Sequence, residues 1–495
     1  MTERQKIFIA YIASGIFLAL SALLISMERF WLSAAIPVGL FLIWLYIYKL
    51  DKVILLITFF TPLAVKLSDM EMGVSVSLPT EPLMFAVLIL FFLKALFESN
   101  YDLKILKHPV SIAILINLIW ILFTSITSEM PVVSFKFFMA RLWFVVPFYF
   151  LGIILFKRID NIKYFLWLYI LPLLYVIGYS TLVLARHGFS EDVSHWAMSP
   201  FYNDHTAYGA ILALLLPFTI GFAVYKKYPV NYRAFSLLIS VILLVALYLS
   251  NSRAAWISFV AAFMVLLIIL FKIKFKYVFL VVGILLGLFF SFRTQIIDRM
   301  EENRQDSSGD FMKHVQSIYN ISTDASNLER LNRWQSALRM FEERPFVGWG
   351  PGTYQFVYAP FQRSKDKTII STNFGNRGNA HSEYLGPLSE SGVLGAVTII
   401  IVVFVVLYRA LWVYKSSRHP EIRMLALTSL LSLTTYFVHG VLNNFLSRDK
   451  LSVPVWGIMA IIVALDIYHR HRESLRAPAP ENGEKDVDES RENKD

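Results

Sequence analysis

Apolar residues fall into long blocks that are separated by short polar connections over most of the chain. Most blocks are about twenty residues long, which is the length of α-helix that spans a bilayer. The third block is shorter and contains Pro62, so it forms either a short span or a re-entrant segment, and the number of spans depends on which. The pattern predicts an all-α polytopic membrane protein with about 12–14 transmembrane helices, at 7–26, 30–48, 53–66, 82–98, 109–127, 134–155, 162–185, 206–225, 234–250, 253–271, 276–292, 392–414, 424–445 and 451–468.

Basic residues alternate between the connections as membrane topology requires. If the N-terminus is cytoplasmic, every second connection should be rich in Lys and Arg. The rich connections hold Lys49 and Lys52; Lys94, Lys104 and Lys107; Lys157, Arg158 and Lys163; Lys226, Lys227 and Arg233; Lys272, Lys274 and Lys276; and Arg409, Lys415, Arg418 and Arg423. The intervening connections hold few, such as Arg29, Arg186 and Arg253. We therefore expect an even number of spans with both ends in the cytoplasm.

Composition agrees with a multi-pass protein of the cytoplasmic membrane. The chain is 56% hydrophobic and 17% charged, and its net charge of +10 is explained by the basic connections without a nucleic-acid partner. The absence of cysteine excludes disulfides and Cys-based metal sites. The first block follows "MTERQK" as in a signal peptide, but it is long and lacks a small-x-small cleavage site, so we expect a retained helix.

One connection is far longer than the others. Residues 293–391 are expected to form a large extracytoplasmic segment with helices of its own, since long segments escape the charge rule. The expected divisions are N-terminal helices over 1–200, core helices over 201–292, the large segment, C-terminal helices over 392–468, and a disordered cytoplasmic tail over 469–495. No internal repeat is evident, which disfavours transporter folds built from two related halves.

The stretch "LYLSNSRAAWISF" at 247–259 joins two apolar blocks with almost nothing between them. Arg253 is expected in the first turn of a helix that Asn251 or Ser252 caps. A helix N-terminus with an adjacent arginine suits a phosphate or pyrophosphate. An arginine that snorkels to the membrane surface is the alternative.

The stretch at 326–354 predicts an amphipathic helix followed by a tight loop. Ser326 and Glu329 form a capping box that starts the helix at Asn327, and Pro345 stops it before three closely spaced glycines. This places Arg330 and Arg333 in the opening turns. Glu329 is spaced to pair with Arg333, which leaves Arg330 to meet a ligand. A solvated arginine on a surface helix is the alternative.

His381 and Glu383 precede a Gly-rich turn and the twelfth span. An imidazole titrates near neutral pH and can accept a proton from a hydroxyl group. The H-x-E spacing is that of zinc deaminases, but those need a Cys pair, and HExxH is also absent. We therefore expect no metal at this stretch. Catalysis by His381 and an inert loop histidine are the two alternatives.

Other polar residues lie in or beside the spans. Lys136 and Arg141 within the sixth span indicate either a bound anion or snorkelled side chains. Interhelical hydrogen bonds are expected of His439, Asn443 and Asn444. A further group, which could line an acceptor site or cap a helix, consists of Asn203, Asp204 and His205.

Three stretches in series resemble the O-antigen ligase and polymerase superfamily. They are "SNSRAAW" at 250–256, "ERLNRWQSALRMFEERPFVGWGPGTYQF" at 329–356 and "NAHSEYLGPLSESGVLGA" at 379–396, within a resemblance that covers about 200–470. Its members are integral glycosyltransferases of the bacterial inner membrane that act on the periplasmic face without a metal or other cofactor. They move a glycan from undecaprenyl pyrophosphate to the lipid A core, a growing polysaccharide or a protein.

The resemblance implies roles for particular residues. His381 matches the histidine proposed to activate the acceptor hydroxyl, with Glu383 as a candidate assistant. Arg253 and Arg330 match arginines proposed to bind the pyrophosphate, with Arg333 as the alternative to Arg330. Arg141 and His205 are additional candidates. The chain departs from many relatives in having Ser382, where they have Asn after the histidine, and fourteen spans exceed the usual twelve.

Four other functions remain as alternatives to a ligase. A polymerase or a protein glycosyltransferase would share the same motifs, because acceptor choice depends on loop shape. A transporter of lipid-linked sugars would carry polar residues through the middle of several spans. A structural scaffold would tolerate loss of Arg253 and His381.

Overall fold

The computed structural model describes residues 3–27, 35–67, 76–97, 102–274, 328–364 and 378–470, with isolated residues at 276–277, 280, 283–284, 287, 291, 367 and 371. The predicted span at 276–292 and the tail beyond 470 therefore lie largely outside the described residues, as do Ser326 and Asn327 of the capping box.

The fold is an all-α polytopic bundle, as the apolar blocks predict. Eight of the described helices are long and apolar enough to cross a membrane. The helices are α1 (Glu3–Ser26), α2 (Ala35–Tyr48), α3 (Leu50–Phe60), α4 (Thr80–Phe97), α5 (Leu103–Leu106), α6 (Pro109–Ile126), α7 (Pro131–Val145), α8 (Leu151–Leu155), α9 (Ile159–Arg186), α10 (Glu191–Ser194), α11 (His205–Val224), α12 (Val230–Leu249), α13 (Arg253–Leu270), α16 (Tyr354–Val357), α17 (Leu385–Ser416), α18 (Pro420–His439) and α19 (Asp449–Ala464). Short 3-10 and π segments are η2 (Thr61–Leu63), η3 (Val146–Phe150), η4 (Ala359–Phe361) and η6 (Leu465–His469).

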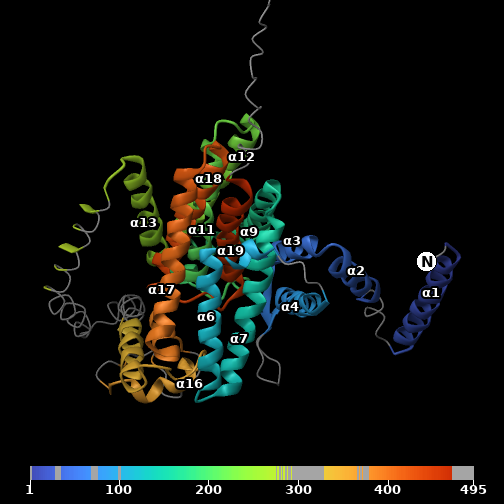
Figure 1. Ribbon diagram of the computed structural model, residues 1–495, viewed down its shortest axis with the longest axis horizontal. Coiled ribbons are helices and arrows are strands. Elements are labelled where there is room, and N and C mark those ends of the chain that lie inside the picture. Colours follow the sequence, from blue (N-terminus) through green and yellow to red (C-terminus); the bar gives the residue numbers. More distant parts are fainter. Residues whose placement is uncertain are drawn as a thin grey trace, which may run out of the picture.

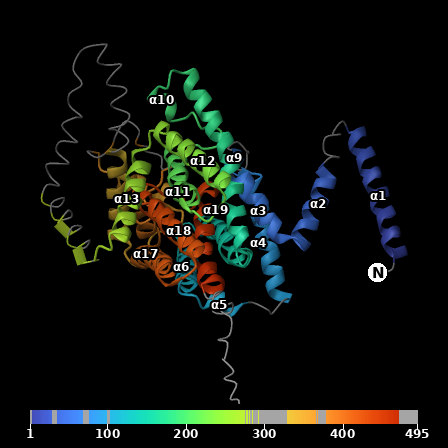
Figure 2. The same ribbon diagram turned by 90° about the horizontal axis from the view of Figure 1, so that it is seen from above.

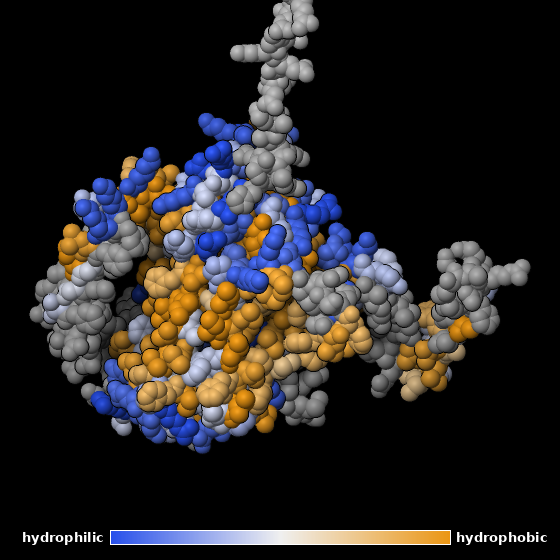
Figure 3. All heavy atoms as spheres, in the orientation of Figure 1, coloured by the Kyte–Doolittle hydropathy of each residue, from blue (hydrophilic) through white to orange (hydrophobic). Residues whose placement is uncertain are grey.

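The core of the bundle lies along two helices. Buried residues make up 78% of the apolar window of α11 and 89% of that of α19 and η6, against 22% for α13. Figure 2 shows α13 at one edge of the bundle and α4 at the opposite edge, with α11 and α19 between them. Figure 3 shows an apolar band between two hydrophilic ends, which is the surface expected of a membrane-embedded bundle.

The third apolar block differs from a full span. Its helix α3 ends at Phe60, and the η2 turn, which contains Pro62, leads into a short strand, β1 (Val65–Leu67). This strand pairs antiparallel with β2 (Val76–Leu78), with Lys66 opposite Ser77. Because an eleven-residue helix is too short to cross the hydrocarbon core, the block does not form the span expected over 53–66.

The described part of the long connection over 293–391 packs on one end of the bundle. Its described helix covers 328–343 and stops before Pro345, as the sequence predicts. In Figure 1 this helix (gold) and α16 lie beside the lower ends of α6, α7 and α17. Backbone contacts join the two parts, since the amide of Glu129, between α6 and α7, donates to the carbonyl of Trp349 over 3.1 Å.

Helix α17 starts earlier than the apolar pattern predicts. The expected span began at residue 392, but helical structure begins at Leu385 and is broken at Gly392, whose φ is +70°. The seven residues before the break therefore form a short helix that begins four residues after His381.

Candidate functional site

His381 is held in an uncommon backbone conformation. Its φ is +45°, in the left-handed region that few residues other than glycine adopt, although histidine is among the more tolerant. Its amide donates to Asn379 Oδ1 over 2.9 Å, and its carbonyl accepts from Trp334 Nε1 over 3.4 Å. Such conformations persist where the surroundings fix them, and they gather at functional sites.

Charged residues from distant segments surround the His381 imidazole. Burial and the nearby Arg333 and Arg330 lower its pKa to about 4, although Asp204 and a hydrogen bond with Asn443 oppose that shift. The ring is therefore neutral near pH 7. A neutral imidazole has one nitrogen free to accept a proton, as a general base requires.

Arg333 is engaged by protein groups. Its Nε donates to Glu329 Oε1 over 2.7 Å, so the ion pair predicted from their spacing is present. Its Nη1 donates to the carbonyl of Asn379 over 3.3 Å. Arg333 thus fastens the 328–343 helix to the loop that carries His381.

Arg330 lies one turn earlier on the same helix and faces a different group. Burial lowers its pKa, while the neighbouring carboxylate of Asp204 raises it. The side chain is half-buried and lies within electrostatic reach of both His381 and His439. The structure therefore brings Arg330 and His381 together, as the sequence motifs suggested.

Asp204 caps α11 and also joins the site. Its Oδ1 accepts from the amide of Thr206 over 2.6 Å, which confirms the capping role considered for it. Its Oδ2 lies 3.7 Å from Arg448 Nη1. His205 stacks on His195 with ring centroids 4.4 Å apart, at the border of the same cluster.

Arg253 is exposed at the first position of α13. The expected cap is wrong in detail, because Ser252 holds the N-cap position but its side chain caps nothing. Asn251 instead donates from Nδ2 to Ser194 Oγ over 3.0 Å. The first backbone N–H groups of α13 are left without an intrahelical acceptor.

The carboxylate of Glu383 binds the loop that follows α18. Its Oε1 accepts from Tyr436 Oη over 2.7 Å and from the amides of Phe445 and Leu446 over 2.6 and 2.8 Å. Arg141 reinforces this arrangement by donating to the carbonyl of Leu446 over 3.4 Å. None of these contacts is with the His381 imidazole, so the geometry favours positioning of the loop by Glu383 over direct catalysis.

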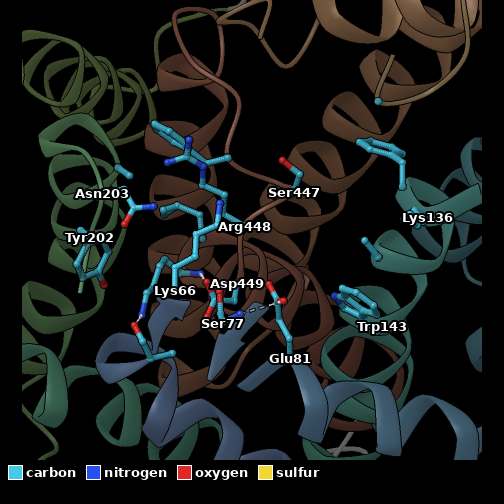
Figure 4. A pocket seen from close by; sticks show the side chains of 18 of the residues that line it. Lys66, Ser77, Glu81, Lys136, Trp143, Tyr202, Asn203, Ser447, Arg448 and Asp449 are labelled. Carbon is cyan, nitrogen blue, oxygen red and sulfur yellow. Dashed lines mark hydrogen bonds between the residues drawn. The ribbon is translucent and has the colours of Figure 1, made fainter. Parts of the chain in front are cut away.

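A cavity of about 480 Å³ adjoins the cluster. Figure 4 shows Lys66 and Arg448 beside Asp449 on one side of it, Lys136 and Trp143 on the other side, and Glu81 between the two groups. Apolar and aromatic side chains of α7 form the opposite wall, namely Val133, Phe137, Ala140 and Trp143. Arg448 lines the cavity and forms an ion pair with Asp204. Asn203 also lines the cavity. The cavity thus combines charged lining residues of both signs with an apolar wall on α7, a helix long enough to span a membrane.

The sequence alone did not single out Lys66 and Arg448 as site residues. Lys136 was noticed because it interrupts an apolar block, but Lys66 and Arg448 stand in polar stretches where cations are common. The only signal for Arg448 was its place in "SRDK" between two spans. In the described parts of the chain, no three His, Cys, Asp or Glu side chains are grouped as a metal site would need.

Comparison with known families adds an independent finding. A family model described as O-antigen ligase matches residues 238–400, a range that contains Arg253, Arg330 and His381. This match supports the resemblance to the O-antigen ligase and polymerase superfamily. No curated protein gives a significant match to the chain.

Proposed function

We propose that this chain, with its O-antigen ligase region, moves a glycan from undecaprenyl pyrophosphate to an acceptor at the periplasmic face of the bacterial inner membrane. The lipid A core is the proposed acceptor. The observation that carries the proposal is the neutral imidazole of His381 beside the cationic Arg330, at one end of a membrane bundle.

The cavity and the adjoining cluster suit a lipid-linked pyrophosphate. The donor has its prenyl chain in the bilayer and its phosphates at headgroup depth, and the cavity offers an apolar wall on α7 beside the cations Lys66 and Arg448. In this proposal Arg330 and Arg448 contact the phosphates, and Arg253 and the N-terminus of α13 flank them. Arg333 does not contact the phosphates in this proposal but holds the His381 loop in place by donating to the carbonyl of Asn379. Preorganised cations of this kind stabilise charge that develops on a leaving group.

His381 acts as the general base in the proposed reaction. The acceptor oxygen attacks the anomeric carbon of the glycan while its proton passes to the free imidazole nitrogen. The bond between the anomeric carbon and the pyrophosphate oxygen breaks, and undecaprenyl pyrophosphate leaves with the electron pair. This single displacement inverts the anomeric configuration and calls on no metal or other cofactor.

A transporter of lipid-linked sugars is the alternative from another class. The described polar cluster gathers at one end of the bundle, whereas the middle of α11 and α19 is built of buried, mostly apolar residues. Transport sites form near the bilayer midplane. This distribution supports an enzyme.

The test is a gel of lipopolysaccharide from the source organism with the gene deleted, together with its lipid-linked glycan pool. Bare lipid A core with long polymer stranded on undecaprenyl pyrophosphate is the expected result. Core that carries a single repeat would identify a polymerase. An unchanged ladder and pool would contradict both and direct attention to protein glycosylation or transport.

A further inference from the structure

The buried carboxylate of Glu383 holds groups from α18 and from the loop that follows it. Glu383 is 8% exposed and stands two residues after His381. Its Oε1 atom accepts from Tyr436 Oη over 2.7 Å and from the amides of Phe445 and Leu446 over 2.6 and 2.8 Å. One oxygen thus joins the loop that carries His381 to a segment more than sixty positions away in the sequence.

Further hydrogen bonds join the same two segments. The amide of Glu383 donates to the carbonyl of Gly440 over 2.8 Å. The next residue, Tyr384, donates from Oη to the carbonyl of Phe437 over 2.9 Å. The His381 loop is therefore fastened both to the end of α18 and to the loop that follows it.

The loop that follows α18, residues 440–448, ends at Arg448. The amide of Arg448 donates to the carbonyl of Phe445 over 3.0 Å, and its guanidinium lies 5.5 Å from the centroid of the Phe445 ring. Arg448 Nη1 also lies 3.7 Å from Asp204 Oδ2, and its side chain lines the cavity. Phe445, whose own amide donates to Glu383, therefore connects this carboxylate to Arg448.

We propose that Glu383 is a positioning residue that sets Arg448, and with it the bound donor phosphates, relative to the His381 imidazole. The inference rests on the proposed function, in which Arg448 contacts the phosphates and His381 is the general base. Transfer requires that the acceptor hydroxyl, the anomeric carbon and the leaving pyrophosphate be aligned, and small misplacements of such groups lower the rate strongly. Glu383 supplies this alignment because it follows the base closely in sequence and holds the loop of the phosphate ligand.

Two substitutions separate positioning by Glu383 from direct catalysis by its charge. Glu383→Gln keeps an oxygen at the same reach that can accept from Tyr436 and the two amides, but it removes the charge. Glu383→Asp keeps the charge and shortens the side chain by one methylene group, so its oxygen is drawn away from those donors. Positioning therefore predicts that the Gln variant is the more active of the two, whereas direct catalysis predicts the reverse.

The experiment uses full-length protein in proteoliposomes, with undecaprenyl-pyrophosphate-linked glycan and lipid A core as substrates. Glu383→Ala and Glu383→Asp are expected to raise the donor KM roughly 10-fold and to lower kcat by about 10-fold or more, because Arg448 and His381 lose their alignment. Glu383→Gln is expected to recover most of both values. If Glu383→Ala does not fold, the other two variants decide: a Gln variant no more active than the Asp variant would overturn the inference.

Arg448→Gln tests whether the effect of Glu383 on the donor passes through Arg448. Residues that act through one another are not additive, so Glu383→Asp should raise the donor KM much less in the Arg448→Gln background than in the wild type. A residue that only stabilises the fold would give equal fold-changes in the two backgrounds. Equal fold-changes, or an unchanged donor KM in Arg448→Gln alone, would overturn the inference.

Glu421→Ala is the matched control. Glu421 also accepts from a tyrosine, Tyr228 Oη, over 2.7 Å, but it lies at the opposite end of α18. Its loss should lower the unfolding midpoint without changing the donor KM. His381→Ala separates the two levels of the account. Wild-type transfer by this variant contradicts the proposed function, whereas an inactive His381→Ala together with wild-type kinetics in Glu383→Asp leaves that function standing and overturns this inference.

Discussion

At the scale of single residues, the account depends on the charges around His381. Arg330 and Arg333 disfavour the imidazolium ion, and together with burial they lower the pKa of the ring to about 4. The same cationic surroundings favour a pyrophosphate. Because a bound pyrophosphate brings negative charge, it offsets the arginines and should make the imidazole more basic once the donor is in place.

This coupling predicts two different acidic limbs in the pH dependence. A base whose pKa is lowered loses its proton at a lower pH, so kcat/KM should fall only as the pH drops toward about 4. The limb of kcat, which reports the substrate complex, should lie at a higher pH. Initial rates between about pH 4 and 8 test this. Coincident limbs near 6.5 would show that the arginines do not act on His381.

Arg330→Gln should weaken binding of the donor. Loss of the cation should raise the donor KM by roughly 10-fold or more, since charge-assisted hydrogen bonds contribute about 1.5–3 kcal/mol. It should also move the kcat/KM limb upward. Arg363→Gln, at an exposed position of the same long connection over 293–391, serves as the control and should keep both values. An unchanged donor KM in Arg330→Gln would remove this residue from the proposed phosphate site.

Sequence motifs predicted part of this site and could not predict the rest. His381, Arg330 and the Glu329–Arg333 pair follow from local spacing and from the resemblance, and the structure brings them together. The contact of Arg448 with Asp204 joins segments that only tertiary packing brings near each other. No local pattern encodes such contacts.

At the scale of elements, the break in α17 joins this helix to the loop that follows the 328–343 helix. The backbone of 345–350 runs beside 389–393, where the amide of Val393 donates to the carbonyl of Pro345 over 2.8 Å and that of Gly350 to Glu390 over 2.7 Å. A Cβ on Gly392 would lie 2.1 Å from the carbonyl oxygen of Phe346. The apolar pattern could not predict this break, because the cause is a contact with a loop some forty residues earlier.

Gly392→Ala should therefore destabilise the protein and lower its activity. A left-handed φ costs a non-glycine residue about 1–3 kcal/mol, and the clash with Phe346 adds to that cost. The midpoint of thermal unfolding in detergent is the measurement. Gly178→Ala, in the interior of α9 with open space around the added methyl, should leave the midpoint equal or slightly higher. Equal midpoints for both variants would contradict the assigned role of the break.

At the scale of the whole molecule, α19 connects two polar ends across the apolar band. Asp449 at its start lines the cavity, and Asp466 lies at the other end in the π segment η6. Asp466 Oδ2 lies 3.0 Å from His108 Nε2 and also accepts from Arg409, while Oδ1 lies 3.2 Å from Arg470 Nε. This cluster ties α6, α17 and the end of α19 together, far from the site.

Asp466→Ala should lower stability while leaving the substrate affinities of the folded protein unchanged. Removing one member of a buried ion pair costs about 3–5 kcal/mol, because the partner charges stay buried without compensation. Asp51→Ala is the control: its side chain is 47% exposed and pairs with an exposed lysine, so a change of about 0–1 kcal/mol is expected. A similar shift in unfolding midpoint for the two variants would show that the cluster does not stabilise the bundle.

The most direct test of the central claim is transfer of labelled glycan from undecaprenyl pyrophosphate to lipid A core by the full-length protein in proteoliposomes. The transfer rate of His381→Ala is predicted to be about 10²–10⁴-fold lower than that of the wild type, with an unchanged unfolding midpoint. His187→Ala, at an exposed histidine after α9, is predicted to keep the wild-type rate. Wild-type transfer by His381→Ala would contradict the account.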